Sequence, residues 1–369
     1  MAETICVAKD GVHAYEIEIT DSFSALVQKL AALGYRREQK ICVVTDSNVG
    51  PLYAQEVAGL LSAAFDTVRV HTFPAGEANK NLDTVGRLYE ELIISHFDRR
   101  DLLVALGGGV VGDLTGFTAA TYLRGIDFIQ IPTTLLAQVD SSVGGKTGVD
   151  FMQYKNMVGA FYQPKLVYMN LSVLRSLPEK QIVSGMGEVL KHGLIKDIAY
   201  YEWMTAHADE IKALAPAALA HTVAGSCRIK RDVVEQDPTE KGERALLNFG
   251  HTIGHAIEKL SDFRLYHGEC VGIGMVAAAY LSAVYGRLPA EAFARIESDL
   301  TKFGFQTRVS GFSPEEVLAA SKSDKKMVGV NVKFILLDKI GTSYIYRDFT
   351  DEQLLSGIRY VCGMEDAHE

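Results

Sequence analysis

The chain has 369 residues and a mass of 40.4 kDa, which suits two domains of ordinary size. Hydrophobic residues make up 48% of it and charged residues 22%, while 37 Lys and Arg against 46 Asp and Glu give a net charge of −9. This composition is typical of a globular protein. An acidic chain without a basic run does not favour nucleic acid or an anionic membrane as a partner.

The five cysteines are scattered, and none are spaced as Cys-x-x-Cys. The pattern indicates free thiols in a reducing compartment rather than a disulfide framework or a thiolate zinc site. The first 18 residues carry acidic side chains and lack the apolar segment of an export signal. The uncharged stretch 270–286 is short for a membrane span and predicts a buried helix. Together these features predict a cytoplasmic protein.

In the first half of the chain, short β-branched runs alternate with amphipathic stretches. Strands are predicted at 41–49, 68–73, 102–107, 128–134 and 165–170, and helices over about 51–64, 82–97 and from the glycines after 107 to about 122. Strands that are separated by helices predict a parallel sheet with helices on both faces.

After Leu177-Pro178 the pattern changes. Long Ala- and Leu-rich helical patterns extend from about 180 to 325, and residues 332–348 predict a hairpin or a pair of strands. The sequence therefore predicts two domains, 1–178 with a parallel α/β sheet and 179–369 mainly helical.

A glycine motif lies between a predicted strand and a predicted helix. Gly107, Gly109 and Gly112 fit G-x-G-x-x-G, in the position where backbone N–H groups cradle a pyrophosphate. A tight turn without a ligand needs the same glycines. The motif follows the third strand rather than the first, which departs from the standard Rossmann arrangement. We therefore expect a nucleotide site that is not of the standard Rossmann form, with Asp46 as a candidate ribose contact.

A histidine cluster follows in the second half. His251 and His255 are four residues apart, so they share one face of a helix, and His267 follows in a glycine-bordered segment. Two histidines and one carboxylate make an open, zinc-type site, for which Glu188 is the best carboxylate candidate. A histidine pair is also common in structural roles, and the helix dipole alone favours an acid near a helix start.

Several cations lie in glycine-rich or polar loops, namely Arg124, Lys146, Lys155, Lys191, Lys230 and Arg244. A single lysine is usually solvated, but this number beside the glycine and histidine motifs predicts a cationic pocket for phosphate and carboxylate. Lys146 lies in a GGKT segment, but Asp140 occupies the place of the first P-loop glycine, which argues against ATP hydrolysis.

Six motifs in sequence order, GGGVVGD, PTT, VDSSVGGKTGVD, SGMGEVLKH, LNFGHTIGHAIE and HGECVGIGM, make the chain resemble the 3-dehydroquinate synthases from about residue 41 to 340. The resemblance implies an N-terminal Rossmann-like α/β domain with a parallel sheet and a C-terminal all-helical metal-binding domain, assembled as a homodimer. It also implies two cofactors, NAD and one divalent metal, zinc or cobalt.

The implied activity is that of a lyase in the shikimate pathway of aromatic amino acid biosynthesis. Such an enzyme converts 3-deoxy-D-arabino-heptulosonate 7-phosphate, a phosphorylated sugar acid, to 3-dehydroquinate and phosphate. The reaction combines transient NAD-dependent oxidation, phosphate elimination, reduction and an intramolecular aldol step.

The same resemblance assigns site residues. It implies Glu188, His251 and His267 as metal ligands, with His255 as an active-site residue instead of a ligand. The implied NAD contacts are Asp46, Glu77, Lys80, Gly108, Gly109, Val110, Asp113, Thr133, Thr134, Lys146, Lys155 and Leu177. The implied substrate contacts are Arg124, Asp140, Lys146, Lys155, Asn156, Lys191, Lys230, Arg244, Asn248, His255 and either Lys325 or Lys326. The residues expected to act in catalysis are Lys146, Asn156, Lys191, Lys230, Glu240 and His255.

Two departures from the family pattern are small: Ser176 replaces a usual Thr, and Gly187 replaces a commoner Ala. Three alternatives remain. Metal-dependent glycerol or alcohol dehydrogenases would need few phosphate-binding lysines. A sibling cyclase for sedoheptulose 7-phosphate or glucose 6-phosphate would differ at the carboxylate end, where Arg244, Asn248 and His255 match. An inactive NAD-binding protein would be expected to have lost a metal ligand.

Overall fold

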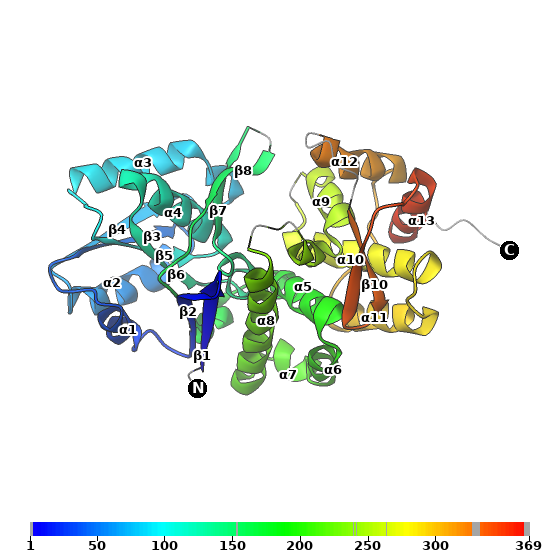
Figure 1. Cartoon of the computed structure of the whole chain (residues 1–369), viewed down its shortest axis with the longest axis horizontal. Helices are drawn as coiled ribbons and strands as arrows, with labels where there is room; N and C mark the ends of the chain where they lie inside the picture. The colour runs from blue at the N-terminus through cyan, green and yellow to red at the C-terminus, as the bar shows by residue number, and fades with distance from the viewer. Residues whose placement is uncertain are drawn as a thin grey trace. The chain divides into compact units, whose positions relative to one another are not determined.

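The computed structural model describes residues 3–152, 154–238, 240, 242–262, 264–326 and 333–364, without the side chains of 323–326. The chain divides into two compact units, Met1–Leu177 and Pro178–Glu369, and each is described by itself below (Figure 1).

The N-terminal unit is built on a seven-stranded sheet in the order β1-β2-β9-β6-β5-β3-β4. Its strands pair in parallel except for β1 with β2. The strands are β1 (Glu3–Lys9), β2 (Val12–Thr20), β3 (Lys40–Asp46), β4 (Thr67–Phe73), β5 (Leu102–Gly107), β6 (Asp127–Pro132) and β9 (Leu166–Asn170). The five predicted strands are confirmed as β3 to β6 and β9, whereas the β1–β2 hairpin was not predicted.

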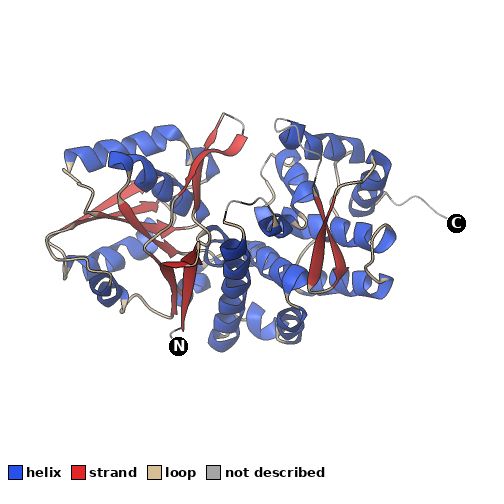
Figure 2. Ribbon diagram, in the orientation of Figure 1, coloured by secondary structure: helices blue, strands red, loops and turns tan. Residues whose placement is uncertain are grey.

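Helices cover both faces of this sheet (Figure 2). Ile41 and Val43 of β3 pack with α1 (Leu26–Ala32) and α2 (Gln55–Ser62). Cys42 and Val44 point to the other face and pack with α3 (Leu82–Ile94) and α4 (Gly109–Thr121). Burial on both faces explains the continuous apolar runs of the central strands. Short helical turns complete the unit: η1 (Gly50–Ala54), η2 (Glu77–Asn79), η3 (Tyr122–Arg124), η4 (Ala137–Ser141) and η5 (Leu171–Ser176).

A separate antiparallel hairpin, β7 (Lys146–Phe151) and β8 (Tyr154–Phe161), also belongs to the N-terminal unit. The segment around Lys146 was expected to be a loop, and this prediction was wrong. Gly148 pairs with Gly159, and a Cβ on Gly159 would lie 2.4 Å from the Thr147 carbonyl oxygen. Glycine therefore serves close backbone pairing here, which residue composition alone did not reveal.

The order of the strands places a switch point between β3 and β5, one strand in from the β4 edge of the sheet. β4 lies on one side of β3 and β5 on the other, so the connections leave in opposite directions. Parallel sheets bind ligands at such points, beyond the carboxyl ends of the strands. Asp46 ends β3, and Gly107 ends β5.

The C-terminal unit is mainly helical, as predicted, but not helical throughout. Its helices are α5 (Glu179–Lys196), α6 (Ile198–Ala206), α7 (Ala208–Lys212), α8 (Pro216–Gln236), η6 (Glu243–Asn248), α9 (His251–Leu260), α10 (His267–Val284), α11 (Ala290–Lys302), α12 (Pro314–Lys326) and α13 (Asp351–Val361). The strand pair predicted within 332–348 is confirmed as β10 (Phe334–Lys339) and β11 (Thr342–Tyr346).

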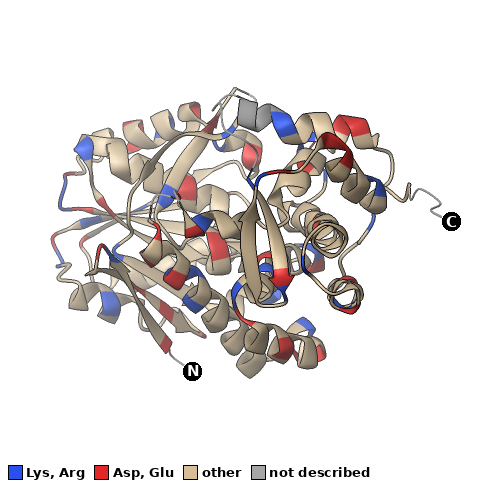
Figure 3. Cartoon of the chain, turned by 45° about the vertical axis from the view of Figure 1, so that its right-hand side comes forward, with Lys and Arg blue, Asp and Glu red and all other residues tan. Residues whose placement is uncertain are grey.

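α10 lies at the centre of this unit and packs against α5, α9, α11 and α13. By length and composition it is the one described helix that could cross a membrane, but 72% of it is buried inside the structure. The buried helix predicted for 270–286 is thereby confirmed. Acidic and basic residues are interspersed along the elements of both units (Figure 3).

Candidate metal and nucleotide sites

Two histidine nitrogens of the C-terminal unit converge on one carboxylate oxygen. Glu188 of α5 is fully buried, and its Oε1 lies 3.5 Å from His251 Nε2 and 3.6 Å from His267 Nε2. This oxygen has no hydrogen-bond partner among the described residues. Two atoms bound to one tetrahedral ion at about 2.0–2.2 Å lie about 3.3–3.6 Å apart. The spacing and the donor types therefore fit a divalent metal ion.

Glycines next to the candidate ligands allow this convergence. Gly268 follows His267, and a Cβ on it would lie 1.9 Å from the Ser184 carbonyl oxygen of α5. A Cβ on Gly187, next to Glu188, would lie 2.9 Å from the Gly268 oxygen. The backbones of α5 and α10 therefore touch directly beside the two ligands.

Glycines also allow the close contact between α9 and α10. A Cβ on Gly274 of α10 would lie 1.9 Å from the Gly250 oxygen, just before His251. A Cβ on Gly254 would lie 2.8 Å from the Cys270 oxygen. The glycines beside the histidines therefore allow α9 and α10 to approach closely.

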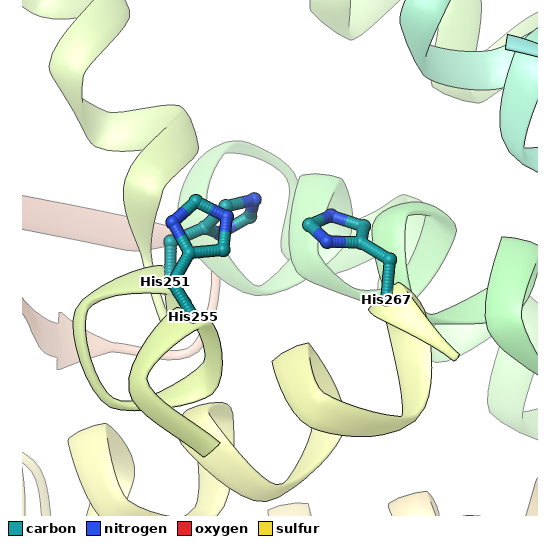
Figure 4. A group of neighbouring side chains, drawn as sticks. All are labelled: His251, His255 and His267. Carbon is teal, nitrogen blue, oxygen red and sulfur yellow. The ribbon is translucent and has the colours of Figure 1, made fainter. Parts of the chain in front are cut away.

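His255 belongs to the same cluster. One ring nitrogen each of His251, His255 and His267 lies within 4.8 Å of the other two. Figure 4 shows the three rings gathered where α9 and α10 begin. The four-residue spacing thus brings two imidazoles of α9 to one face, and the exposed His255 stands beside the Glu188 site.

A buried lysine sets the charge state of this site. Lys191 lies one turn after Glu188 and pairs with its Oε2, and both side chains are buried. Burial opposes ionisation of Glu188, but Lys191, followed by His251 and His267, outweighs it and holds the pKa of the carboxyl well below its usual range. Burial and the Lys191 charge likewise hold the pKa of His251 well below its usual range. An anionic carboxylate and a neutral imidazole are the forms that bind metals.

Glu258 was missed in the sequence. It is buried on α9, and its Oε2 lies 3.1 Å from His267 Nδ1. Burial lowers the pKa of His267, but the neighbouring carboxylates of Glu188 and Glu258 prevail and raise it to about 9. The spacing in the sequence could have predicted this position, because Glu258 follows His251 by seven residues and so lies on the same helix face.

The glycine turn of the N-terminal unit shows two kinds of glycine. A Cβ on Gly107 would lie 2.4 Å from Val111 Cγ2, and one on Gly112 would lie 2.8 Å from Gln130 Oε1, so packing alone requires these two. Gly108 is the N-cap of α4, which begins at Gly109. The Thr133 hydroxyl beside this turn is buried and has no hydrogen-bond partner among the described residues. An open helix start and an unsatisfied hydroxyl at the switch point fit a phosphate-bearing cofactor.

Comparisons with known proteins decide the family. The family model for the 3-dehydroquinate synthase N-terminal region matches residues 70–184, and that for the C-terminal region matches 185–327. The 3-dehydroquinate synthase of Acetivibrio thermocellus is 44% identical over 348 residues, covering 94% of this chain and 95% of the relative. The chain belongs to the 3-dehydroquinate synthase family. The 3-dehydroquinate synthase of Symbiobacterium thermophilum is 43% identical over 355 residues, covering 94% of this chain and 98% of the relative.

Solved structures extend the comparison beyond the 3-dehydroquinate synthases. A structure of 2-deoxy-scyllo-inosose synthase complexed with carbaglucose-6-phosphate, NAD+ and Co2+ has a TM-score of 0.86 at 26% identity, covering 98% of this chain and 100% of that one. Glycerol dehydrogenase from Schizosaccharomyces pombe has a TM-score of 0.65 at 16% identity, covering 98% and 92%. The dehydrogenase alternative thus shares the fold alone.

In this member of the 3-dehydroquinate synthase family, Lys80 joins several of the expected NAD contacts. Its buried ammonium lies 2.6 Å from Asp113 of α4 and 3.9 Å from Glu77. It also donates to Asn156 Oδ1 at 2.6 Å. Burial opposes its charge, but Asp113 and Glu77 prevail and raise the pKa of Lys80. The Lys155 ammonium lies 3.9 Å from the same Glu77.

The other expected residues of the N-terminal unit lie at ends of elements. Asp46 Oδ1 accepts the N–H groups of Asn48 and Val49 at 2.8 and 2.9 Å, which fixes this carboxylate at the end of β3. The remaining positions are Val110 in the first turn of α4, Arg124 at the end of η3, Thr133 and Thr134 after β6, Asp140 in η4, Lys146 at the start of β7 and Leu177 after η5.

Among the expected substrate contacts of the C-terminal unit, Arg244 and Asn248 form hydrogen bonds with nearby residues. Lys230 of α8 and Arg244 of η6 are buried, and Arg244 Nη1 donates to the Pro238 carbonyl at 2.8 Å. Asn248 Nδ2 donates to Glu240 Oε1 at 2.9 Å. Lys325 and Lys326 end α12, and their side chains lie outside the described part of the chain.

Proposed function

We propose that the chain catalyses the 3-dehydroquinate synthase reaction, converting 3-deoxy-D-arabino-heptulosonate 7-phosphate to 3-dehydroquinate and phosphate. The observation that carries this proposal is the convergence of Glu188, His251 and His267, in a chain 44% identical to a 3-dehydroquinate synthase over 94% of its length. The enzyme is a phosphate-eliminating lyase of the shikimate pathway.

Two cofactors fit the two sites. Glu188, His251 and His267 would hold one divalent ion, zinc or cobalt. The α4 start and its neighbours would hold NAD through Asp46, Glu77, Lys80, Gly108, Gly109, Val110, Asp113, Thr133, Thr134, Lys146, Lys155 and Leu177. The NAD+ and Co2+ in the 2-deoxy-scyllo-inosose synthase structure support both assignments. When bound, they supply a Lewis acid and a reversible hydride acceptor, so that no net NADH accumulates.

Cationic and amide donors would bind the substrate phosphate. Lys191 and Lys230 are buried in the C-terminal unit, where water screens their charges little, so they favour a dianionic group strongly. Lys146 and Asn156 would contribute from the N-terminal hairpin. Stabilising the charge of the departing phosphate lowers the barrier to its elimination.

His255 would relay protons. Its ring nitrogen lies within 4.8 Å of a nitrogen of His251 and of His267, and its side chain is exposed where they are not. An imidazole that does not bind the metal ion is able to accept and donate protons in catalysis.

Arg244 and Asn248 would hold the carboxylate end of the substrate, together with Lys325 or Lys326. Arg244 Nη1 donates to the Pro238 carbonyl, which helps to orient the guanidinium, a group whose planar fork matches a carboxylate. Glu240 would act by fixing the Asn248 amide. Arg124 and Asp140 would contact the substrate from the N-terminal unit.

Phosphate release from the purified, metal-loaded chain with NAD⁺ tests the proposal. The heptulosonate phosphate, sedoheptulose 7-phosphate and glucose 6-phosphate are offered side by side, with a chelated control. We expect release from the first alone, abolished by chelation and without net NADH. Release from another sugar would indicate a sibling cyclase, and NADH from glycerol would indicate a dehydrogenase.

We also propose a cytoplasmic homodimer. The family resemblance supports the dimer, and the five free cysteines support a reducing compartment. Sedimentation velocity should give twice the chain mass, and a monomer at micromolar concentration would contradict the assembly.

A further inference from the structure

Three residues of the N-terminal unit form a closed ring of hydrogen bonds. The Lys80 ammonium donates to Asn156 Oδ1 at 2.6 Å, and the Asn156 backbone N–H donates to Asp150 Oδ1 at 2.8 Å. The Asp150 backbone N–H closes the ring by donating to the Lys80 carbonyl oxygen at 2.8 Å. The ring thus joins the residue after η2 to both strands of the β7–β8 hairpin.

An irregularity in the hairpin makes the ring possible. Val149 pairs with Val158, but the register shifts before Phe151 pairs with Tyr154. Asp150 falls at this shift, so its N–H turns from the ladder to Lys80. Asn156 stands opposite with a φ of 54°, in the left-handed region that asparagine tolerates better than most residues. Bulges of this kind re-aim side chains near active sites.

The ring determines which way the Asn156 amide faces. An ammonium group can only donate, so Asn156 must turn its oxygen toward Lys80. Lys80 cannot move away easily, because it is buried and paired with Asp113 at 2.6 Å. The NH₂ group of Asn156 therefore faces away from Lys80, with its two hydrogens directed outward. A phosphate group can accept hydrogen bonds from both N–H donors of this amide.

We propose that Asp150, to which the sequence motifs assign no role, is a positioning residue for Asn156. By holding the Asn156 backbone at the register shift, Asp150 keeps the amide turned with its NH₂ group toward an anion. The inference rests on the proposed function, in which Asn156 contacts the substrate phosphate. It adds that the affinity for phosphate depends on a carboxylate that does not itself touch the phosphate.

Two substitutions separate the hydrogen bond from the charge. Asp150→Ala removes the acceptor, whereas Asp150→Asn keeps an oxygen at the same place. Inorganic phosphate is titrated calorimetrically into the metal- and NAD-loaded chain, and KM and kcat are measured with the heptulosonate phosphate. We expect Asp150→Ala to weaken phosphate binding and raise KM by about 5–10-fold, the effect of one lost hydrogen bond. Asp150→Asn should stay within about twofold of the wild type on the same scale.

A matched control and a double-mutant cycle test whether Asp150 acts through Asn156. Asp66→Ala removes an exposed aspartate paired with Arg37 at 2.7 Å in the same unit, and it should change neither quantity. In an Asn156→Ala background, Asp150→Ala should add less than about twofold, because the amide it positions is gone. A purely structural role would give the same factor in both backgrounds.

The outcomes distinguish this inference from the proposed function. An Asp150→Ala variant with unchanged phosphate affinity, or an equal loss in both backgrounds, would overturn the positioning role. Failure of the wild-type chain to bind phosphate would overturn it as well. Phosphate binding that depends on Asp150, without turnover of the heptulosonate phosphate, would support the positioning role and reject only the proposed activity.

Discussion

Glu258 Oε2 lies 3.1 Å from His267 Nδ1, so the second nitrogen of one candidate metal ligand faces a buried carboxylate. The other histidine differs, because His251 Nδ1 lies 3.2 Å from the Phe249 backbone carbonyl oxygen. A carboxylate partner fixes the proton on Nδ1 and makes the Nε2 lone pair more basic than a neutral carbonyl does. The two imidazoles are therefore unequal donors.

Removing this carboxylate should weaken metal binding. We expect Glu258→Ala to lower the metal affinity by about 10–100-fold, and Glu258→Gln, which keeps an acceptor without the charge, to lower it less. Competition with a chromophoric chelator measures the affinity, and the visible spectrum of the cobalt-loaded chain reports the ligand field. Glu269→Gln, at the capping box of α10, is the control. Unchanged affinity in Glu258→Ala would refute the second-nitrogen argument.

His255 and His251 should respond differently to alanine. His251→Ala should lose the metal, because it deletes a candidate ligand. His255→Ala should keep the metal but lose turnover by about 10²–10⁴-fold, the usual contribution of a proton-transferring group. Metal content by atomic absorption and phosphate release are measured on the same samples. Turnover of His255→Ala within about twofold of the wild type would remove the relay role on that scale.

Two glycines beside the metal ligands should differ in their tolerance of alanine. A Cβ on Gly268 would lie 1.9 Å from a backbone oxygen, so α5 and α10 would have to separate, costing about 3 kcal/mol or more. At Gly187 the contact is 2.9 Å, also to a backbone oxygen, so a shift is needed there as well, but a smaller one. Alanine regains about 1 kcal/mol of helix propensity, so we expect Gly187→Ala to destabilise the chain less than Gly268→Ala. Urea unfolding of the chelated proteins tests the order. Equal destabilisation would contradict the direct backbone contact.

The cysteines should differ sharply in reactivity. Cys6 is exposed, and the other four are buried. Burial and nearby Glu91 raise the pKa of Cys42 to about 12. A thiol reagent should therefore label Cys6 alone in the folded chain and all five cysteines in denaturant. Cys6→Ser should abolish the fast phase, and a remaining fast phase would show that the fold opens around a buried thiol.

The raised pKa of Cys42 predicts a loss of stability at alkaline pH. The folded Cys42 thiol titrates near 12, above its ordinary 9.0, so the folded chain holds this proton when the unfolded chain has lost it. The stabilisation is complete below the lower value and disappears as the pH rises toward the higher one. The free energy of unfolding should fall above pH 9.0, and less steeply in Cys42→Ala. Parallel slopes would assign the loss to other groups.

Periodicity predicted the central sheet because β3 and β5 are buried on both faces and read as continuous apolar runs. The β1–β2 hairpin had a detectable signal, since residues 15–20 of β2 alternate between apolar and polar side chains. The β7–β8 hairpin had none, because its glycines and lysines are equally typical of an anion-binding loop.

The metal cluster could be expected because histidines four residues apart must share a helix face. The Lys80–Asp150–Asn156 ring could not be predicted, because it depends on a register shift and on a lysine 76 residues before Asn156. A local sequence pattern predicts which side chains share one face of a helix. It does not predict which backbone N–H groups leave the strand pairing at a register shift and bond to a distant residue.

The position of β2 in the sheet affects how the N-terminal unit is made. β2 pairs with β1 and β9, and the Thr20 hydroxyl donates to the Met169 carbonyl 149 residues later. On the ribosome, β1 and β2 therefore emerge long before β9, the strand that β2 joins. Until β9 is made, β1 and β2 can form only an isolated two-stranded hairpin, which is marginally stable in water. Closure of this side of the sheet is thus a late event in folding, because β2 can join it only after β9 has been made.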